Sequence, residues 1–254
     1  MTADDVLARD LAVAAGERLL ALRAKGGDPA ELRNAGDRLS HEFLAAELAR
    51  LRPGDAVLSE EGKDDPARLS ARRVWIVDPL DGTREFGEAG RVDWAVHVAL
   101  WSDGELTAGA VALPAQDKVL STAEPIAPLP PPHDPLRLLV SRSRPPEFVQ
   151  RLAAEIGATL VPLGSAGAKA AAVITGAADA YVHSGGQYEW DSAAPVAVAQ
   201  SAGLHTSRID GSKLAYNQAS PSLPDILICP AVIAPLLLKT IDSVLSAPTD
   251  PESS

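Results

Sequence analysis

The chain has 254 residues, of which 46% are hydrophobic and 22% are charged, so it can build a core and is not expected to be disordered. The net charge of −11 argues against a nucleic-acid-binding protein, although metal ions can still bring a small anionic substrate to an acidic site. Cys229 is the only cysteine, which excludes an internal disulfide and suits a reducing cytoplasm. We expect no signal peptide, because the N-terminus Met-Thr-Ala-Asp-Asp is acidic and leads into an amphipathic pattern. We expect no membrane span, because no run approaches ~20 apolar residues.

The first half of the chain predicts two helices followed by an antiparallel meander. Apolar spacing indicates helices over 4–24 and 37–50, and a short strand begins at Val57. We expect the charged segment 61–72 to be mobile. Further strands are predicted over 74–77, 92–101, 106–113 and 118–122.

Six prolines between residues 125 and 135 predict a boundary between two subdomains. Residues 1–124 would form an α+β unit with most of the metal ligands, and residues 136–246 an α/β unit before a frayed tail over 247–254. Strands and helices alternate in the second unit, which favours a layered α/β arrangement. Its expected strands are 136–141, 160–163, 178–183, 204–205 and 226–229, and its expected helices are 145–156, 165–175, 191–202 and 230–246.

The most informative motif is Asp78-Pro-Leu-Asp-Gly-Thr83, which follows the apolar run 74–77. It predicts a buried strand that ends by presenting two carboxylates, in the position where α/β proteins often bind ligands. Further acids lie in the pair Glu60-Glu61 and at Asp191. Hard oxygen ligands from separate segments suit Mg²⁺, and paired Mg²⁺ ions suit the cleavage of phosphate esters.

Each acidic motif also has a plain structural interpretation. Asp-Pro and Asp-Gly are common in ordinary turns, and taken alone the first motif is more simply a turn. Glu60 and Glu61 could be a solvated surface pair, and Asp191 could cap a helix. An EF-hand is excluded because its first, third and fifth positions would be Asp, Leu and Gly.

Three blocks together resemble the inositol monophosphatase family of Mg²⁺-dependent, lithium-sensitive phosphatases. The blocks are Ser59-Glu-Glu-Gly62, Trp75-Ile-Val-Asp-Pro-Leu-Asp-Gly-Thr-Arg-Glu-Phe86 and Trp190-Asp-Ser-Ala-Ala194, and the resemblance spans roughly residues 4 to 240. It implies an α-β-α-β-α sandwich of the sugar-phosphatase type, two or three Mg²⁺ ions and a homodimer.

The resemblance also implies residue roles. Glu60, Asp78 and the Leu80 carbonyl would hold the ion that activates water, while Asp78, Asp81 and Asp191 would hold the ion at the leaving oxygen. Thr83 would orient the water with Asp37 as its partner, and Glu61 would support a weaker third ion. The backbone of Gly82 and Thr83 would bind phosphate. The approach to the helix acid, Arg33-Asn-Ala-Gly-Asp37, departs from the family's usual Ala-Asp or Thr-Asp.

Residues beyond the acidic motif resemble the bisphosphate nucleotidases of sulfate assimilation. Arg84-Glu85-Phe86 is typical of them, and a cation beside the metals suits a second phosphate. Ser141-Arg-Ser-Arg144 and Gly164-Ser165 with Lys169 are similar to their substrate-binding segments. The alternatives are a surface ion pair for Arg84, a solvated loop containing Ser141 and Arg142, a plain helix cap at Ser165 and a solvent-facing Lys169.

The expected activity is therefore removal of the 3'-phosphate from 3'-phosphoadenosine 5'-phosphate, leaving AMP, with the related 3'-phosphoadenylyl sulfate as a second substrate. Inositol 1-phosphate and fructose 1,6-bisphosphate are the alternative substrates. A noncatalytic phosphometabolite-binding protein and a structural module remain the alternatives of another class. The five histidines share no motif, and His97 in its alternating strand is expected to be a packing residue.

Overall fold

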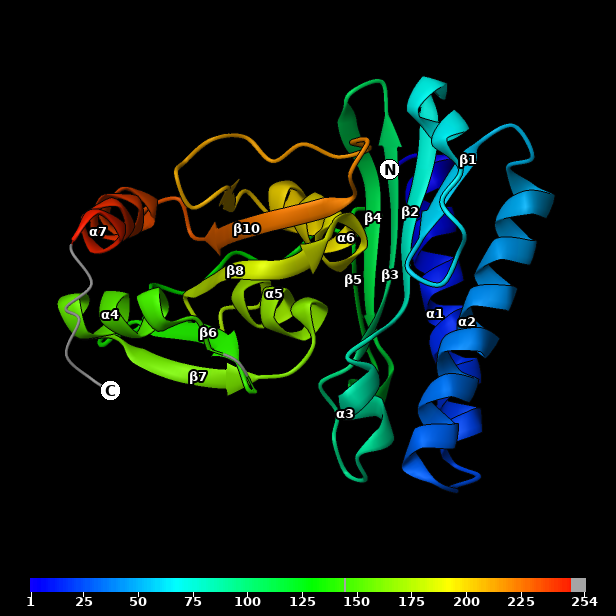
Figure 1. The fold of residues 1–254 in the computed structure, drawn as a ribbon, viewed down its shortest axis with the longest axis horizontal. Coiled ribbons are helices and arrows are strands. Elements are labelled where there is room, and N and C mark those ends of the chain that lie inside the picture. The colour runs from blue at the N-terminus through cyan, green and yellow to red at the C-terminus, as the bar shows by residue number, and fades with distance from the viewer. Residues whose placement is uncertain (144, 248–254) are drawn as a thin grey trace.

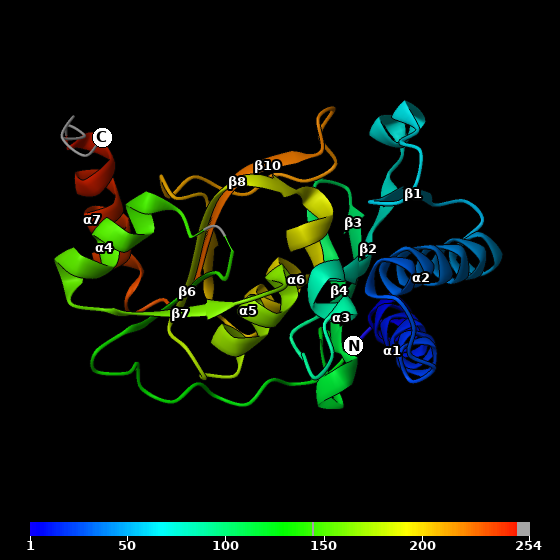
Figure 2. The same cartoon turned by 60° about the horizontal axis from the view of Figure 1, so that its bottom comes forward.

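The computed structural model describes residues 1–143 and 145–247, and its helices and sheets alternate in five layers, α-β-α-β-α (Figure 1). The same order is visible after rotation (Figure 2). The predicted layered sandwich is confirmed. The helices are α1 Ala3–Arg23, α2 Pro29–Leu51, α3 Thr83–Gly87, α4 Glu147–Ile156, α5 Ala166–Ile174, α6 Glu189–Ser201 and α7 Ala234–Ser246, with short 3₁₀ turns η1 Pro66–Ser70 and η2 Pro114–Gln116.

The first sheet has the order β1-β2-β3-β4-β5 and carries α1 and α2 on its outer face (Figure 1). Its strands are β1 Ala56–Ser59, β2 Arg73–Asp81, β3 Ala95–Ser102, β4 Glu105–Leu113 and β5 Lys118–Ser121. Only the β1–β2 pairing in this sheet is parallel, so the rest forms the expected meander.

The second sheet has the order β7-β6-β8-β10-β9, with α4 and α7 on its outer face. Its strands are β6 Arg137–Ser141, β7 Thr159–Leu163, β8 Ala180–Tyr188, β9 His205–Ser207 and β10 Ser222–Cys229. Strand β6 runs parallel to both neighbours, whereas β10 is antiparallel to β8 and β9. Helices α5 and α6 fill the layer between the sheets (Figure 2).

The core follows from strands that are apolar on both faces. In β2, Val74 and Ile76 pack into the central layer, whereas Trp75 and Val77 pack against the α1 and α2 layer. Strand side chains alternate between faces, so a continuous apolar run supplies two cores at once. The same alternation makes β2 a rigid support for the acidic residues at its end.

Several predicted boundaries are wrong. Helix α2 begins at Pro29, eight residues before the predicted start, because Asp28 caps it with hydrogen bonds from the amides of Ala30 and Glu31 and Pro29 fits the first turn. Asp37 therefore lies well inside the helix.

The charged segment 61–72 contains η1, whose Arg68 side chain is 1% exposed. Helix α6 begins at Glu189, before Asp191, and β3 begins three residues after the predicted start. No helix in the described part of the chain is long and apolar enough to cross a membrane.

Candidate active site

An irregular stretch near the end of β2 brings two acids to one place. Residues three apart on a regular strand point to opposite faces, but the β2–β3 register shifts between Asp78 and Asp81. Asp78 lies opposite His97 and Asp81 lies opposite Ala95, so β2 has an extra residue between these pairs. Such a bulge re-aims side chains beside active sites. Together with Asp191 near the start of α6, these acids offer one oxygen each within 4.8 Å of one another.

Asp81 is surrounded by donors. The Ser165 hydroxyl donates to it at 2.5 Å, and the backbone amides of Ala166 and Gly167 at the start of α5 donate at 3.1 and 2.6 Å. Nε2 of His97 lies 3.2 Å away. Burial alone would raise the pKa of Asp81, but the His97 charge and these hydrogen bonds lower it to about 2.

The remaining acids of the cluster face one another. Burial, then the charges of Glu60 and Asp81, raises the pKa of Asp78 well above its usual range. Glu60 follows the last residue of β1 and is exposed as a residue, yet desolvation of its carboxyl and the Asp191 charge raise its pKa to about 7. Burial and Asp81 raise the pKa of Asp191 to about 6. Like charges held this close favour proton uptake or a bound cation.

Thr83 contacts the acid that the resemblance paired with it. Its hydroxyl lies 3.3 Å from Asp37 Oδ1 and 3.0 Å from the Leu80 carbonyl oxygen. Helix α2 approaches this closely because residue 36 is glycine: a Cβ there would lie 2.8 Å from the Phe86 ring. Burial and then the Glu61 charge raise the pKa of Asp37 to about 6. Glu61 itself is exposed.

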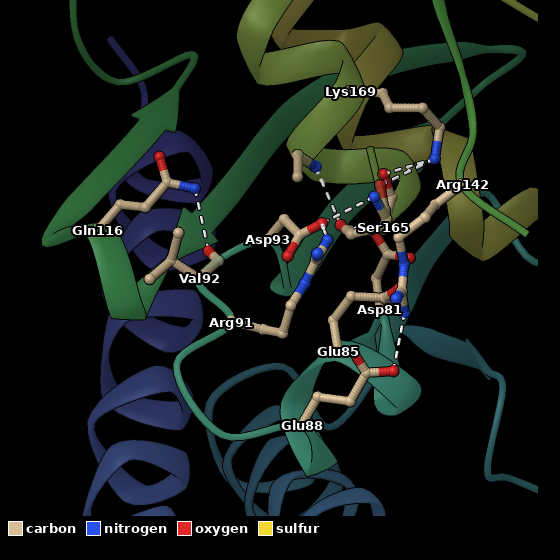
Figure 3. A network of polar contacts seen from close by, with 12 residues as sticks. Asp81, Glu85, Glu88, Arg91, Val92, Asp93, Gln116, Arg142, Ser165 and Lys169 are labelled. Carbon is tan, nitrogen blue, oxygen red and sulfur yellow. Dashed lines mark hydrogen bonds and ion pairs between the residues drawn. The ribbon is translucent and has the colours of Figure 1, made fainter. Parts of the chain in front are cut away.

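Cationic residues also lie near Asp81, and Figure 3 shows Arg142 and Lys169 beside it and beside Glu85. Arg142, at the end of β6, pairs with Glu85 and Glu88 at 2.9 Å each. Lys169 is 5% exposed and donates to the carbonyls of Gly164 and Ser165 at 2.9 and 2.8 Å, so the solvent-facing alternative for it is wrong.

Ser165 and Arg84 are also predicted substrate residues. Ser165 caps α5 through the Ala168 amide, while it also binds Asp81. Arg84 is exposed. Arg144 lies outside the described residues.

Two cavities adjoin the acidic cluster. One of about 600 Å³ is bordered by Asp81, Asp191 and the glycine pair 185–186. The other, of about 230 Å³, is bordered by Gly82, Thr83, Arg84, Glu85 and Arg142. Ser141, Ser165 and Lys169 border both cavities. A substrate with a reacting group at the acids has room on either side.

The sequence prediction did not assign His97 to the site. It is fully buried, and its Nδ1 lies 3.1 Å from the Trp190 carbonyl while Nε2 faces Asp81. Burial alone would lower the pKa of His97, but Asp81 raises it. A polar residue in an otherwise apolar alternating strand was the available signal.

Comparison with known proteins agrees with this geometry. The sequence model of the inositol monophosphatase family matches residues 4–125 and 135–246, so the chain belongs to that family.

The chain is 52% identical to a protein named 3'-phosphoadenosine 5'-phosphate phosphatase from Mycobacterium leprae (strain TN), over 95% of this chain and 94% of that protein. It is 33% identical to 3'(2'),5'-bisphosphate nucleotidase CysQ from Escherichia coli (strain K12), over 72% of this chain and 78% of that protein. The crystal structure of CysQ from Bacteroides thetaiotaomicron superposes with a TM-score of 0.75 at 26% identity, covering 89% of this chain and 97% of that one.

Proposed function

We propose that this protein is a Mg²⁺-dependent phosphatase that removes the 3'-phosphate of 3'-phosphoadenosine 5'-phosphate and leaves AMP, with 3'-phosphoadenylyl sulfate as a further substrate. The observation that carries the proposal is the meeting of carboxylates from β1, β2 and α6 beside two cavities, one of which is bordered by arginines. The names of the relatives at 52% and 33% identity support this choice of substrate.

Four carboxylates and one carbonyl would hold the metals. Glu60, Asp78 and the Leu80 oxygen would form one set, and Asp78, Asp81 and Asp191 would form the other. Glu61 would be a fifth carboxylate that supports a weaker third ion. Bound Mg²⁺ would supply an activated water and charge stabilisation at the leaving oxygen. The donor set fits, because hard cations prefer oxygen ligands and the mutual repulsion of these acids is relieved by positive charge.

Thr83 and Asp37 would orient the attacking water. The Thr83 hydroxyl has one hydrogen, shared between Asp37 at 3.3 Å and the Leu80 carbonyl at 3.0 Å. Its oxygen can therefore accept a hydrogen bond from water while the hydroxyl donates to an acceptor on the protein. Orientation of this kind lowers the barrier without any proton leaving the threonine.

The second phosphate of the substrate would lie in the cavity bordered by Arg84 and Arg142. Arg142 already shows a geometry suited to anions, since one of its nitrogens contacts two carboxylates at 2.9 Å. A bound phosphate would compete with Glu85 and Glu88 for this guanidinium. Ser141, Ser165 and Lys169, between the two cavities, would contact the nucleotide.

The test compares kcat/KM for the adenosine bisphosphate, inositol 1-phosphate and fructose 1,6-bisphosphate at saturating Mg²⁺. We expect the nucleotide to be preferred at least about tenfold, or ~1.4 kcal/mol. A preference for inositol 1-phosphate would assign the same chemistry to that substrate. Binding of the nucleotide without turnover would instead indicate a sensor.

The finer properties of the family belong to the same proposal: two or three Mg²⁺ ions, lithium sensitivity, a homodimer and a place in the cytoplasm for sulfate assimilation. Mg²⁺ titration by calorimetry tests the number of ions, and sedimentation analysis tests the homodimer.

A further inference from the structure

A buried arginine links the loop that follows Glu60 and Glu61 to a distant part of the chain. Arg68 in η1 is 1% exposed and donates to Asn217 Oδ1 at 2.7 Å and to the Gln218 carbonyl at 2.9 Å, about 150 residues away. Asp64 neutralises it from within the loop, with Nε to Oδ1 at 2.6 Å. Asn217 returns a hydrogen bond from Nδ2 to the Arg68 carbonyl at 3.2 Å.

The connection continues to the first residue of α6. Glu189 is 1% exposed, and its two carboxylate oxygens accept from the amides of Asn217 and Gln218 at 2.6 and 2.8 Å. Glu189 stands two residues before Asp191. A continuous chain of hydrogen bonds thus runs from the η1 loop, through residues 217–218, to the turn that carries Asp191.

Burying a guanidinium only to hold a surface loop in place costs free energy, because the charge loses its hydration. Removing a charge from water costs several kcal/mol unless its hydrogen bonds are satisfied, and an apolar anchor of similar volume would stabilise the fold as well or better. Unlike an apolar side chain, the arginine also orients the loop, because its planar donors fix the distance and the angle to Asn217 and Gln218.

We propose that Arg68 is a positioning residue that, through Asn217 and Glu189, holds the loop after Glu60 and Glu61 in register with Asp191. This inference rests on the proposed function, since it concerns the carboxylates assigned there to metal binding. Glu60 and Asp191 come from different layers of the fold. Arg68 would fix the distance between them through its hydrogen bonds to Asn217 and Gln218, which in turn bind Glu189. The carboxylates would then be preorganised for metal binding, and the ion would not have to move them into place.

The experiment measures Mg²⁺ binding by calorimetry and amide hydrogen exchange over residues 59–72 in the full-length protein. Arg68→Met removes the donors and keeps an unbranched side chain. We expect its Mg²⁺ affinity to fall about 10- to 100-fold, the usual effect of losing an outer partner of a metal site. Exchange over 59–72 should rise in the absence of metal. Arg72→Met is the matched control, because Arg72 makes an exposed ion pair with Asp103 near the same loop and should change neither quantity.

Asn217→Gly provides a second route if Arg68→Met does not fold. Asn217 has φ +58°, which glycine adopts without strain, so this variant deletes the side-chain contacts of Asn217 with Arg68 and keeps the backbone hydrogen bond to Glu189. We expect it to weaken Mg²⁺ binding in the same direction.

The outcomes separate the two proposals. If the unaltered protein binds no Mg²⁺, the proposed function fails. If it binds Mg²⁺ and both folded variants bind equally well with unchanged exchange, Arg68 only stabilises the fold and this inference is overturned.

Discussion

The two ends of the acidic cluster contrast in how their charge is balanced. Asp81 lies among donors from β3 and α5, and its pKa is lowered to about 2. Glu60 and Asp78 face other acids, and the pKa of each is raised. The charge of Asp81 is already balanced by the protein, whereas Glu60 and Asp78 would be stabilised by bound protons or cations. Under the proposed function, a single cluster would combine one carboxylate held fixed by the protein with others whose repulsion favours metal binding.

The largest expected effect distinguishes Asp81→Asn from Asp78→Asn in the absence of metal. Asp81→Asn removes the buried carboxylate that faces His97 and accepts hydrogen bonds from Ser165, Ala166 and Gly167, and removing one partner of a buried charged network costs about 3–5 kcal/mol. Asp78→Asn removes repulsion, so the free energy of unfolding should stay level or increase. Denaturant unfolding measures both. Equal destabilisation by the two substitutions would contradict the contrast.

Both substitutions should also lower kcat by at least about 10²-fold, because each removes a carboxylate from the proposed metal sets. Asp103→Asn is the control, since the Asp103 side chain makes an exposed ion pair with Arg72 and belongs to neither proposed metal set. Activity that survives in Asp78→Asn would show that the cluster has another role.

Metal affinity should depend steeply on pH. Mg²⁺ bound at the proposed site would displace protons from Glu60 and Asp191, whose pKa values are raised to about 7 and about 6. The Mg²⁺ concentration for half-saturation should therefore fall as pH rises from 5.5 to 7.5, by up to about tenfold per unit for each proton displaced. Calorimetry in buffers of different ionisation enthalpy detects the released protons.

The metal-free protein should show the opposite trend in stability. Carboxyls with raised pKa bind protons more tightly in the folded state, so their stabilisation is lost as pH rises through about 6 and 7. The raised pKa of His97 acts in the same direction. Asp81 contributes with the other sign, only as pH falls from about 4 toward 2. Thermal unfolding with and without Mg²⁺ at pH 5.5 and 8 measures the difference; a metal-free protein that gains stability toward pH 8 would refute the raised values.

A smaller effect is expected at the arginine side. Arg142→Met should raise KM for the adenosine bisphosphate at least about tenfold, since a hydrogen bond to a charged group contributes roughly 1.5–3 kcal/mol. Inositol 1-phosphate has no second phosphate, so its KM should not change. An equal rise for both substrates would mean that Arg142 only fastens α3 through Glu85 and Glu88.

Sequence reasoning predicted the layers and the acids better than the contacts around them. The strand 74–77 and the acids at 78 and 81 were readable because an apolar run ended in a distinctive motif. The start of α2 was missed because Asp28-Pro29 introduces a polar stretch with weak periodicity. His97 was missed because a polar residue in an apolar strand was interpreted as packing, although its partner Asp81 lies on the neighbouring strand. Arg68 was missed because no local pattern encodes its contact with Asn217, 149 residues away.

The smallest expected effect tests how tightly Asp81, His97 and the start of α5 pack together. A Cβ on Gly167 would lie 2.1 Å from His97 Nε2, so Gly167→Ala must move either the imidazole or the start of α5. Overpacking of this kind costs about 1–3 kcal/mol, and each kcal/mol corresponds to roughly 2–4 °C in Tm for a chain of this size. Gly54→Ala is the control, because nothing lies within 4 Å of a Cβ there. The amide of Gly167 donates to Asp81, so the displacement should also weaken Mg²⁺ binding. An unchanged Tm would show that the structure around Asp81 accommodates the added methyl group without strain.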